Sequence, residues 1–132
     1  MRKFYLVPLL LVLSIILFGC HSIYEGEPLD VDILLMDEII TDGNIEAYIV
    51  IPIELTSKDE LTEITFTSAS LIYERNFQTI GQSHNVLVIY FYSSEDNFNH
   101  EINDYGYLTY DINLNEENFG LKLQENNLIF NK

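Results

Sequence analysis

The chain has 132 residues with 21 Asp or Glu against six Lys or Arg, and its formal net charge is −15. This acidity argues against nucleic acid as a partner, because proteins bind nucleic acid by neutralising its phosphates with Lys and Arg. Since Cys20 is the one cysteine, an intramolecular disulfide is excluded and a hydrophobic core must stabilise the fold.

The start of the chain has the plan of a secretory signal peptide. Arg2 and Lys3 form a basic segment, an apolar stretch runs from Phe4 to Phe18, and the small residue Gly19 precedes Cys20. Basic, apolar and small-residue segments in this order are typical of such leaders. The apolar stretch is shorter than the roughly 20 residues that a membrane-spanning helix needs.

The segment Leu17-Phe18-Gly19-Cys20 resembles the lipobox of bacterial lipoproteins, which is an aliphatic residue, a variable one, a small one and then cysteine. The resemblance implies that a diacylglyceryl group is attached to the Cys20 sulfur and that the leader is cut between Gly19 and Cys20. Two acyl chains would keep the protein on the membrane, because stable anchoring takes two such signals. An uncleaved anchor, or an ordinary signal peptide with a chance cysteine, is the alternative.

These features predict three segments. Residues 1–19 are the expected lipoprotein signal peptide, residues 20–30 an acidic tether, and residues 31–132 a single β-domain. We expect the domain to lie in the cell envelope, outside the cytoplasm, with lipidated Cys20 holding it to a bacterial membrane.

Behind the tether, hydrophobicity mostly alternates with the period of two that is typical of strands. Val31 to Met36 is an expected strand, and Asp42-Gly43-Asn44 is a turn signal. Ile45 to Leu55 alternates most regularly, with Tyr48 on its polar side. Leu61 to Tyr73 is a longer β-leaning run, in which a bulge over Thr67 to Ser70 would reconcile the two faces.

The second half continues in the same way. Asn85 to Tyr92 is apolar on both faces, which favours a strand in the middle of the structure, covered on each side. Leu108 to Leu114 alternates again. We also expect a terminal hairpin, in which Phe119 to Leu123 and Leu128 to Phe130 are joined by a turn at Glu125-Asn126-Asn127.

Seven or eight short strands at spacings near ten residues predict an all-β fold. The best match is a small β-sandwich of immunoglobulin-like architecture, and a small β-barrel is the alternative.

Two groups of residues are candidates for binding. The loop Ser94 to Asp104 is rich in Asp, Glu and Asn, which are calcium ligands, but it lacks the spacing of a calcium loop, and a solvated connection is favoured. The aromatic candidates are Tyr90, Tyr92, Tyr105 and Tyr107. Alternate residues of a strand share a face, so Tyr90 with Tyr92, and Tyr105 with Tyr107, could each form an exposed patch that binds protein or saccharide. Filling the interior is the other reading of these rings.

The sequence contains no motif for nucleophilic or metal-assisted catalysis, and its three histidines lack metal-ligand spacing. We therefore expect no catalytic residues, metal site or cofactor. The prediction is a non-enzymatic lipoprotein whose domain binds an envelope protein or a saccharide. Alternatives are a small-ligand or calcium-binding accessory protein and an inhibitor of an envelope enzyme.

Overall fold

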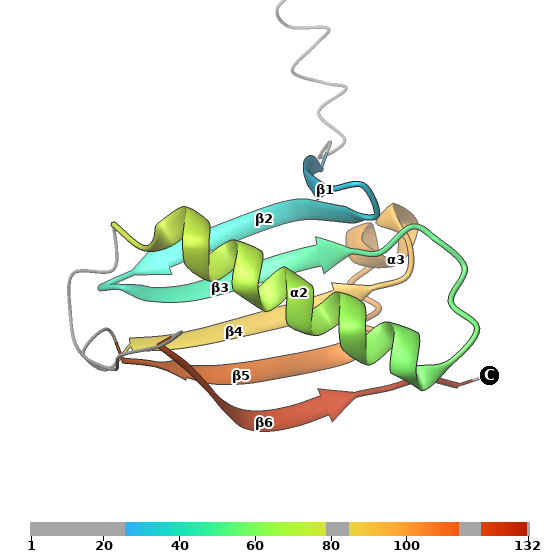
Figure 1. The fold of residues 1–132 in the computed structure, drawn as a ribbon. Coiled ribbons are helices and arrows are strands. Elements are labelled where there is room, and N and C mark those ends of the chain that lie inside the picture. The colour runs from blue at the N-terminus through green and yellow to red at the C-terminus, as the bar shows by residue number, and fades with distance from the viewer. Residues whose placement is uncertain (1–25, 79–84, 114–119, 132) are drawn as a thin grey trace, which may run out of the picture.

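A computed structural model describes residues 26–78, 85–113 and 120–131. In these residues six strands form one sheet, and a long helix lies across one of its faces (Figure 1). The strands are β1 (Glu27–Asp30), β2 (Ile33–Thr41), β3 (Asn44–Val50), β4 (Asn85–Tyr92), β5 (Gly106–Ile112) and β6 (Leu121–Leu128). The helices are α2 (Lys58–Asn76) and the short α3 (Glu95–Asn99).

The strands lie in the sheet in the order in which they occur in the chain, from β1 to β6. Neighbours are antiparallel except β3 and β4, which are parallel. A parallel pair needs a long crossover connection, and α2 lies within that connection. The chain therefore passes from β3 to β4 through α2, and the helix packs on one face of the sheet.

The turn between β2 and β3 is confirmed at the position that the sequence predicted. Asp42 and Gly43 both have positive φ, at 52° and 83°, as the tight turn of a two-residue hairpin requires. The Asn85 side chain donates a hydrogen bond of 3.1 Å to the Asp42 carbonyl, so the start of β4 is tied to this turn.

The main core lies between α2 and the sheet. Every second residue of β3, β4 and β5 points towards the helix and is buried. The buried strand residues of this layer are Ile45, Ala47, Ile49, Leu87, Ile89, Phe91, Leu108, Tyr110 and Ile112. Burying a large apolar side chain contributes about 1.5–3 kcal/mol, so this layer is the main source of stability.

Helix α2 begins with a well-formed cap. Ser57 is the N-cap, and its hydroxyl accepts a hydrogen bond of 3.2 Å from the Glu60 backbone N–H. The Glu60 carboxylate in turn accepts from the Thr56 backbone N–H at 3.1 Å. This is close to the reciprocal capping arrangement that starts many helices.

The buried stripe of α2 is partly polar. Thr65 and Ser68 are both fully buried, and their hydroxyls donate to the carbonyls of Thr62 and Ile64 in the same helix. These internal bonds satisfy the two hydroxyls, so small polar residues can pack against the sheet. The exposed side of α2 carries Phe66, which is 40% exposed.

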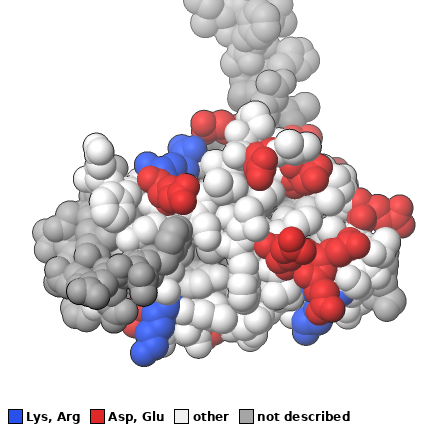
Figure 2. Space-filling model, viewed as in Figure 1, with Lys and Arg blue, Asp and Glu red and all other residues white. Residues whose placement is uncertain are grey.

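The surface on the α2 side is acidic. Acidic side chains form several clusters in this view, whereas basic side chains are few (Figure 2). On the side that carries the helix, acidic side chains therefore outnumber basic ones (Figure 2), in agreement with the negative net charge.

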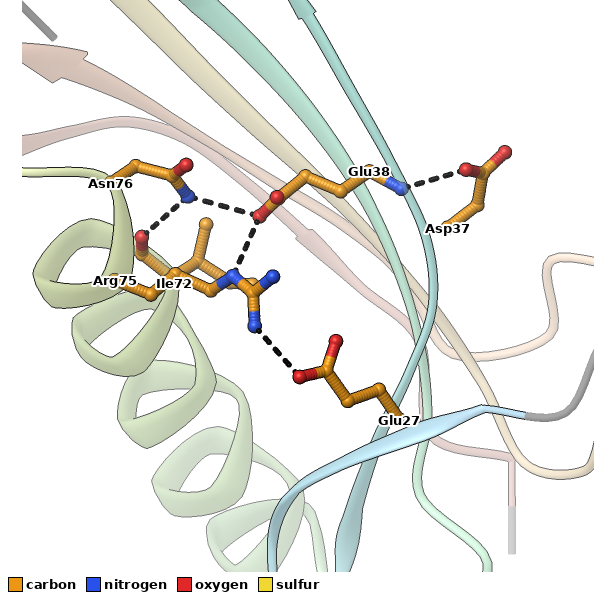
Figure 3. A network of polar contacts seen from close by, with 6 residues as sticks. All are labelled: Glu27, Asp37, Glu38, Ile72, Arg75 and Asn76. Carbon is orange, nitrogen blue, oxygen red and sulfur yellow. Dashed lines mark hydrogen bonds and ion pairs between the residues drawn. The ribbon is translucent and has the colours of Figure 1, made fainter. Parts of the chain in front are cut away.

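A polar network joins the end of α2 to β1 and β2 (Figure 3). The Glu38 carboxylate accepts a hydrogen bond of 2.9 Å from Asn76 Nδ2 and lies 3.3 Å from Arg75 Nε. Arg75 also reaches Glu27 of β1 at 3.5 Å. Glu38 is thus held on the helix side of the sheet, and the network fastens the edge strand β1.

The predominantly β character that the sequence predicted is confirmed, but the finer architecture differs. The described residues contain one mixed sheet of six strands that is not closed into a barrel, so the small β-barrel is wrong. A sandwich of seven or eight strands with immunoglobulin-like architecture is not confirmed, because α2, and not a second sheet, packs on the covered face.

Several local predictions are corrected as well. The run Leu61 to Tyr73, expected as a bulged strand, lies inside α2. The expected terminal hairpin is wrong, because β6 continues through Glu125-Asn126-Asn127 as one strand. Strand β1 forms within the expected tether 20–30. The expected signal peptide 1–19 and the expected lipidation site Cys20 lie outside the described residues. Among the residues that the structure describes, no helix is long and apolar enough to span a membrane.

Candidate functional site

The face of the sheet opposite α2, here called the open face, is the candidate binding surface. Side chains alternate along each strand, so the residues between the core positions point to this side. On β4 these are Val86, Val88, Tyr90 and Tyr92, of which Val86 is 37% exposed. The prediction that both faces of this strand are covered is therefore wrong at its Val86 end.

Three tyrosines form a row across the open face, here called the tyrosine ladder. Tyr48 of β3 is opposite Tyr90 of β4, and Tyr90 is opposite Tyr107 of β5. The rings of Tyr48 and Tyr90 are stacked, with centroids 5.2 Å apart and planes 16° from parallel. The Tyr90 and Tyr107 centroids are 5.7 Å apart. The ladder thus crosses the adjacent strands β3, β4 and β5.

Polar groups continue the row at both ends. Asp37 of β2 is opposite Tyr48, and Asn127 of β6 is opposite Tyr107. The Tyr107 hydroxyl donates to the Glu125 carboxylate at 3.4 Å, and Asn127 Nδ2 donates to the same carboxylate at 3.1 Å. The row therefore combines flat aromatic surface with carboxylate acceptors.

The surroundings of Tyr48 and Tyr90 favour the protonated form of their hydroxyls. Burial raises the pKa of Tyr48, and the carboxylates of Glu46, Asp37 and Glu101 raise it further. Burial, followed by the charge of Glu46, also raises the pKa of Tyr90. These hydroxyls remain neutral hydrogen-bonding groups at physiological pH, and the surrounding charge is negative.

A second small cluster of apolar residues stabilises one end of the open face. Met36, Val50 and Tyr92 are buried there, and Tyr48, Tyr90 and Phe98 pack against them. The Phe98 ring comes from α3 and meets Tyr92 edge to face, with centroids 5.4 Å apart. Tyr92 is therefore largely a packing residue, at 6% exposure.

The structure brings three of the four predicted aromatic candidates to one face and separates the fourth. Tyr90, Tyr92 and Tyr107 lie on the open face, whereas Tyr105 packs against the core on the α2 side. Tyr105 precedes β5, and the next residue, Gly106, has φ of +82°. This backbone conformation breaks the alternation that would have placed Tyr105 beside Tyr107.

The acidic loop Ser94 to Asp104 is folded around its own side chains. Asp104 accepts hydrogen bonds from the Ser93 backbone N–H at 3.0 Å, from the Ser93 hydroxyl, and from Asn97 Nδ2 at 3.2 Å. Ser94 caps α3 through the Asn97 backbone N–H. Asp104 thus fixes the loop that carries Phe98. No group of three potential metal ligands is found in the part of the chain that the structure describes.

Sequence reasoning did not single out Tyr48 and Phe98. Tyr48 was expected on the polar side of its strand, but nothing local shows that β3 and β4 are neighbours. Phe98 was read as part of a solvated loop. Ser94 followed by Glu95 and Asp96 was an available signal, because a serine N-cap with acidic residues in the first turn is typical of a helix start.

Comparison of the chain with protein-family models, with curated proteins and with solved structures finds no match.

Proposed function

We propose that the protein is a lipid-anchored, non-enzymatic binding protein of the bacterial cell envelope that holds a partner protein on its open face. The tyrosine ladder is the observation that carries this proposal. Tyrosine offers a large, rigid contact area and a hydrogen-bonding hydroxyl at low entropic cost, which explains its enrichment at protein interfaces.

The remainder of the open face supports the same role. Ile39 and Val86, at 44% and 37% exposure, add apolar surface beside the ladder. Together with Val88 and Glu46 they line a shallow hollow of about 220 Å³. Apolar and aromatic residues in the centre with charged groups around them are typical of protein interfaces.

The anchoring part of the proposal rests on the lipobox-like segment and predicts a definite covalent product. The full chain is expressed in a bacterium, and the intact mass of the membrane-bound product is measured. We expect a chain that starts at Cys20 and carries a diacylglyceryl group, and a Cys20→Ser variant that leaves the membrane fraction. An unmodified Cys20 or an intact leader in the wild type would contradict it.

The binding part is tested with matched surface variants. Full-length wild type, Tyr90→Ser/Tyr107→Ser and Phe66→Ser are immobilised in neutral-lipid nanodiscs and exposed to envelope extract. Phe66 is an exposed aromatic residue of α2, outside the open face. We expect a retained protein to be lost with the tyrosine variant and kept with Phe66→Ser. Retention of saccharide instead of protein, or equal loss with both variants, would overturn the choice of partner.

A further inference from the structure

A hollow of about 340 Å³ lies next to the tyrosine ladder at the α3 end of the open face. Its lining includes Asp37, Tyr48, Tyr92, Phe98, Asn99 and Glu101. These residues come from β2, β3, β4, α3 and the turn after α3, so the hollow exists only in the assembled fold. We call it the aromatic hollow.

The aromatic walls of this hollow are mutually supported. The Phe98 ring stands edge-on to Tyr48, with centroids 6.1 Å apart, and edge-on to Tyr92, with centroids 5.4 Å apart. Phe98 is positioned by α3, which the Asp104 hydrogen bonds to Ser93 and Asn97 tie to the end of β4. A ligand that enters therefore meets rings that are already ordered, which lowers the entropic cost of binding.

Two carboxylates accompany the rings. Asp37 and Glu101 both line the hollow, and both are near enough to Tyr48 to raise its pKa in addition to the effect of burial. Glu101 acts in the same direction on Tyr92. The hollow is thus lined by both aromatic side chains and carboxylates, on a protein whose net charge is −15.

This combination is complementary to a cation that has a flat apolar surface. Aromatic rings attract cations through their π-systems, with a free energy of about 0.5–1 kcal/mol at exposed sites. Guanidinium groups stack on such rings and also form paired hydrogen bonds with carboxylates. An anionic group would be repelled by Asp37 and Glu101.

We propose that the aromatic hollow binds an arginine side chain of a basic partner protein. The inference rests on the proposed binding function and specifies the chemistry of the partner. The negative charge of the whole domain increases the rate at which a basic partner arrives, and the hollow fixes where its arginine is bound.

The test uses the full chain in neutral-lipid nanodiscs and a fluorescent tri-arginine amide peptide as the probe, with a tri-citrulline peptide as its neutral isostere. Binding is followed by fluorescence anisotropy at constant ionic strength. We expect the arginine peptide to bind and the citrulline peptide to bind at least about fivefold more weakly, since the difference is one of charge at an aromatic and carboxylate site.

Glu101→Gln and Glu74→Gln are the matched variants, because each removes one carboxylate from an exposed position. Glu101 lines the hollow, whereas Glu74 belongs to α2 on the other side of the sheet. We expect Glu101→Gln to weaken binding of the arginine peptide about fivefold, because it removes an exposed ion pair, and Glu74→Gln to leave it nearly unchanged. Phe98→Leu, checked for retained folding by thermal unfolding, should weaken it as well.

Equal effects of the two glutamine variants would show attraction by overall charge alone and would overturn the inference. Absence of arginine binding, or preferential binding of a neutral oligosaccharide, would also overturn it. The proposed function fails separately, when the Tyr90→Ser/Tyr107→Ser variant retains the same envelope protein as the wild type. The two failures are therefore distinguishable.

Discussion

Tyr90 stacks on Tyr48 across the parallel strands β3 and β4, with the two ring planes only 16° apart. The two strands are separated in the chain by α2, so the stack joins residues that are distant in the sequence. An aromatic pair of this kind contributes about 0.5–1.5 kcal/mol beyond the area that it buries. The ladder should therefore stabilise the sheet in addition to forming a surface.

A double-mutant cycle on Tyr48 and Tyr90 measures this contribution. We expect Tyr48→Ala and Tyr90→Ala to show a coupling free energy of about 0.5–1.5 kcal/mol in urea unfolding, because each substitution removes the same ring contact. Tyr48 with Tyr107 is the control pair, since these residues lie two strands apart. A coupling as large in the control pair would mean that the ring contact is not its source.

The second prediction concerns the polar network of Glu38, Arg75 and Asn76 at the end of α2. Glu38→Ala removes one of the two carboxylates that contact Arg75 and an acceptor of Asn76, and Asn76 is only 4% exposed. Hydrogen bonds to charged groups are worth about 1.5–3 kcal/mol, so we expect a loss of stability in this range. It is measured by urea unfolding.

Glu27→Ala is the matched control for Glu38→Ala, because it removes the other carboxylate that contacts Arg75. The Glu27 side chain is 64% exposed, and exposed ion pairs contribute at most about 1 kcal/mol. The two variants should therefore differ clearly. Equal losses in the free energy of unfolding would indicate that the burial of Glu38 does not strengthen its contacts with Arg75 and Asn76.

The strands were largely predictable because burial on one face leaves a period of two in the sequence. Ile45, Ala47 and Ile49 face the core, and the residues between them face outwards. Strand β6 was misread because its exposed position at the edge of the sheet allows a polar run, and Glu125-Asn126-Asn127 then has the composition of a turn.

Helix α2 was missed because its buried stripe does not look apolar. Thr65, Ser68 and Asn76 occupy buried positions, and Phe66 lies on the exposed side. The pattern of hydrophobic residues alone therefore lacked the helical period. The cap formed by Ser57 and Glu60 was a usable signal, since serine followed three residues later by glutamate is typical of a helix start.

The candidate surface was predictable only in part, because it depends on which strands are neighbours. Tyr90 and Tyr107 were selected from their own segments, but their contact follows from the pairing of β4 with β5. Tyr48 joins them through the parallel pairing of β3 with β4. No local pattern specifies that pairing, since it is set by the packing of α2 on the sheet.

Gly106 gives a third prediction. Its φ is +82°, and a Cβ at this position would overlap the backbone carbonyl oxygen of Asn127. Gly106→Ala should therefore separate β5 from β6 locally and cost about 3 kcal/mol or more in urea unfolding, since backbone atoms cannot yield as a side chain can.

Gly26→Ala is the comparison for Gly106→Ala. The nearest atom to a Cβ at Gly26 is Met36 Sδ at 2.6 Å, which is the flexible end of a side chain. We expect a clearly smaller loss there. If both alanine variants were equally stable, the close approach of β6 to Gly106 would not exist in solution.

The last prediction concerns alkaline unfolding and Tyr110. Burial raises the pKa of Tyr110 from 10.0 to about 12, and the residue is 7% exposed. Its neutral form is therefore favoured in the folded state. The resulting stabilisation is fully present below pH 10, and it is lost as the pH rises from 10 through 12, because the unfolded chain ionises first.

Tyr110→Phe removes this ionisation while keeping the ring, so its stability should fall less with pH than that of the wild type. At about 1.4 kcal/mol for each pH unit above the unfolded pKa, the difference between the two profiles should reach about 2 kcal/mol near pH 11.5. Urea unfolding at pH 9 and near pH 11.5 measures it. Burial also raises the pKa of Tyr90 and Tyr105, so the variant still loses some stability. Parallel profiles for the two proteins would place the Tyr110 hydroxyl in contact with water and would contradict its position under α2.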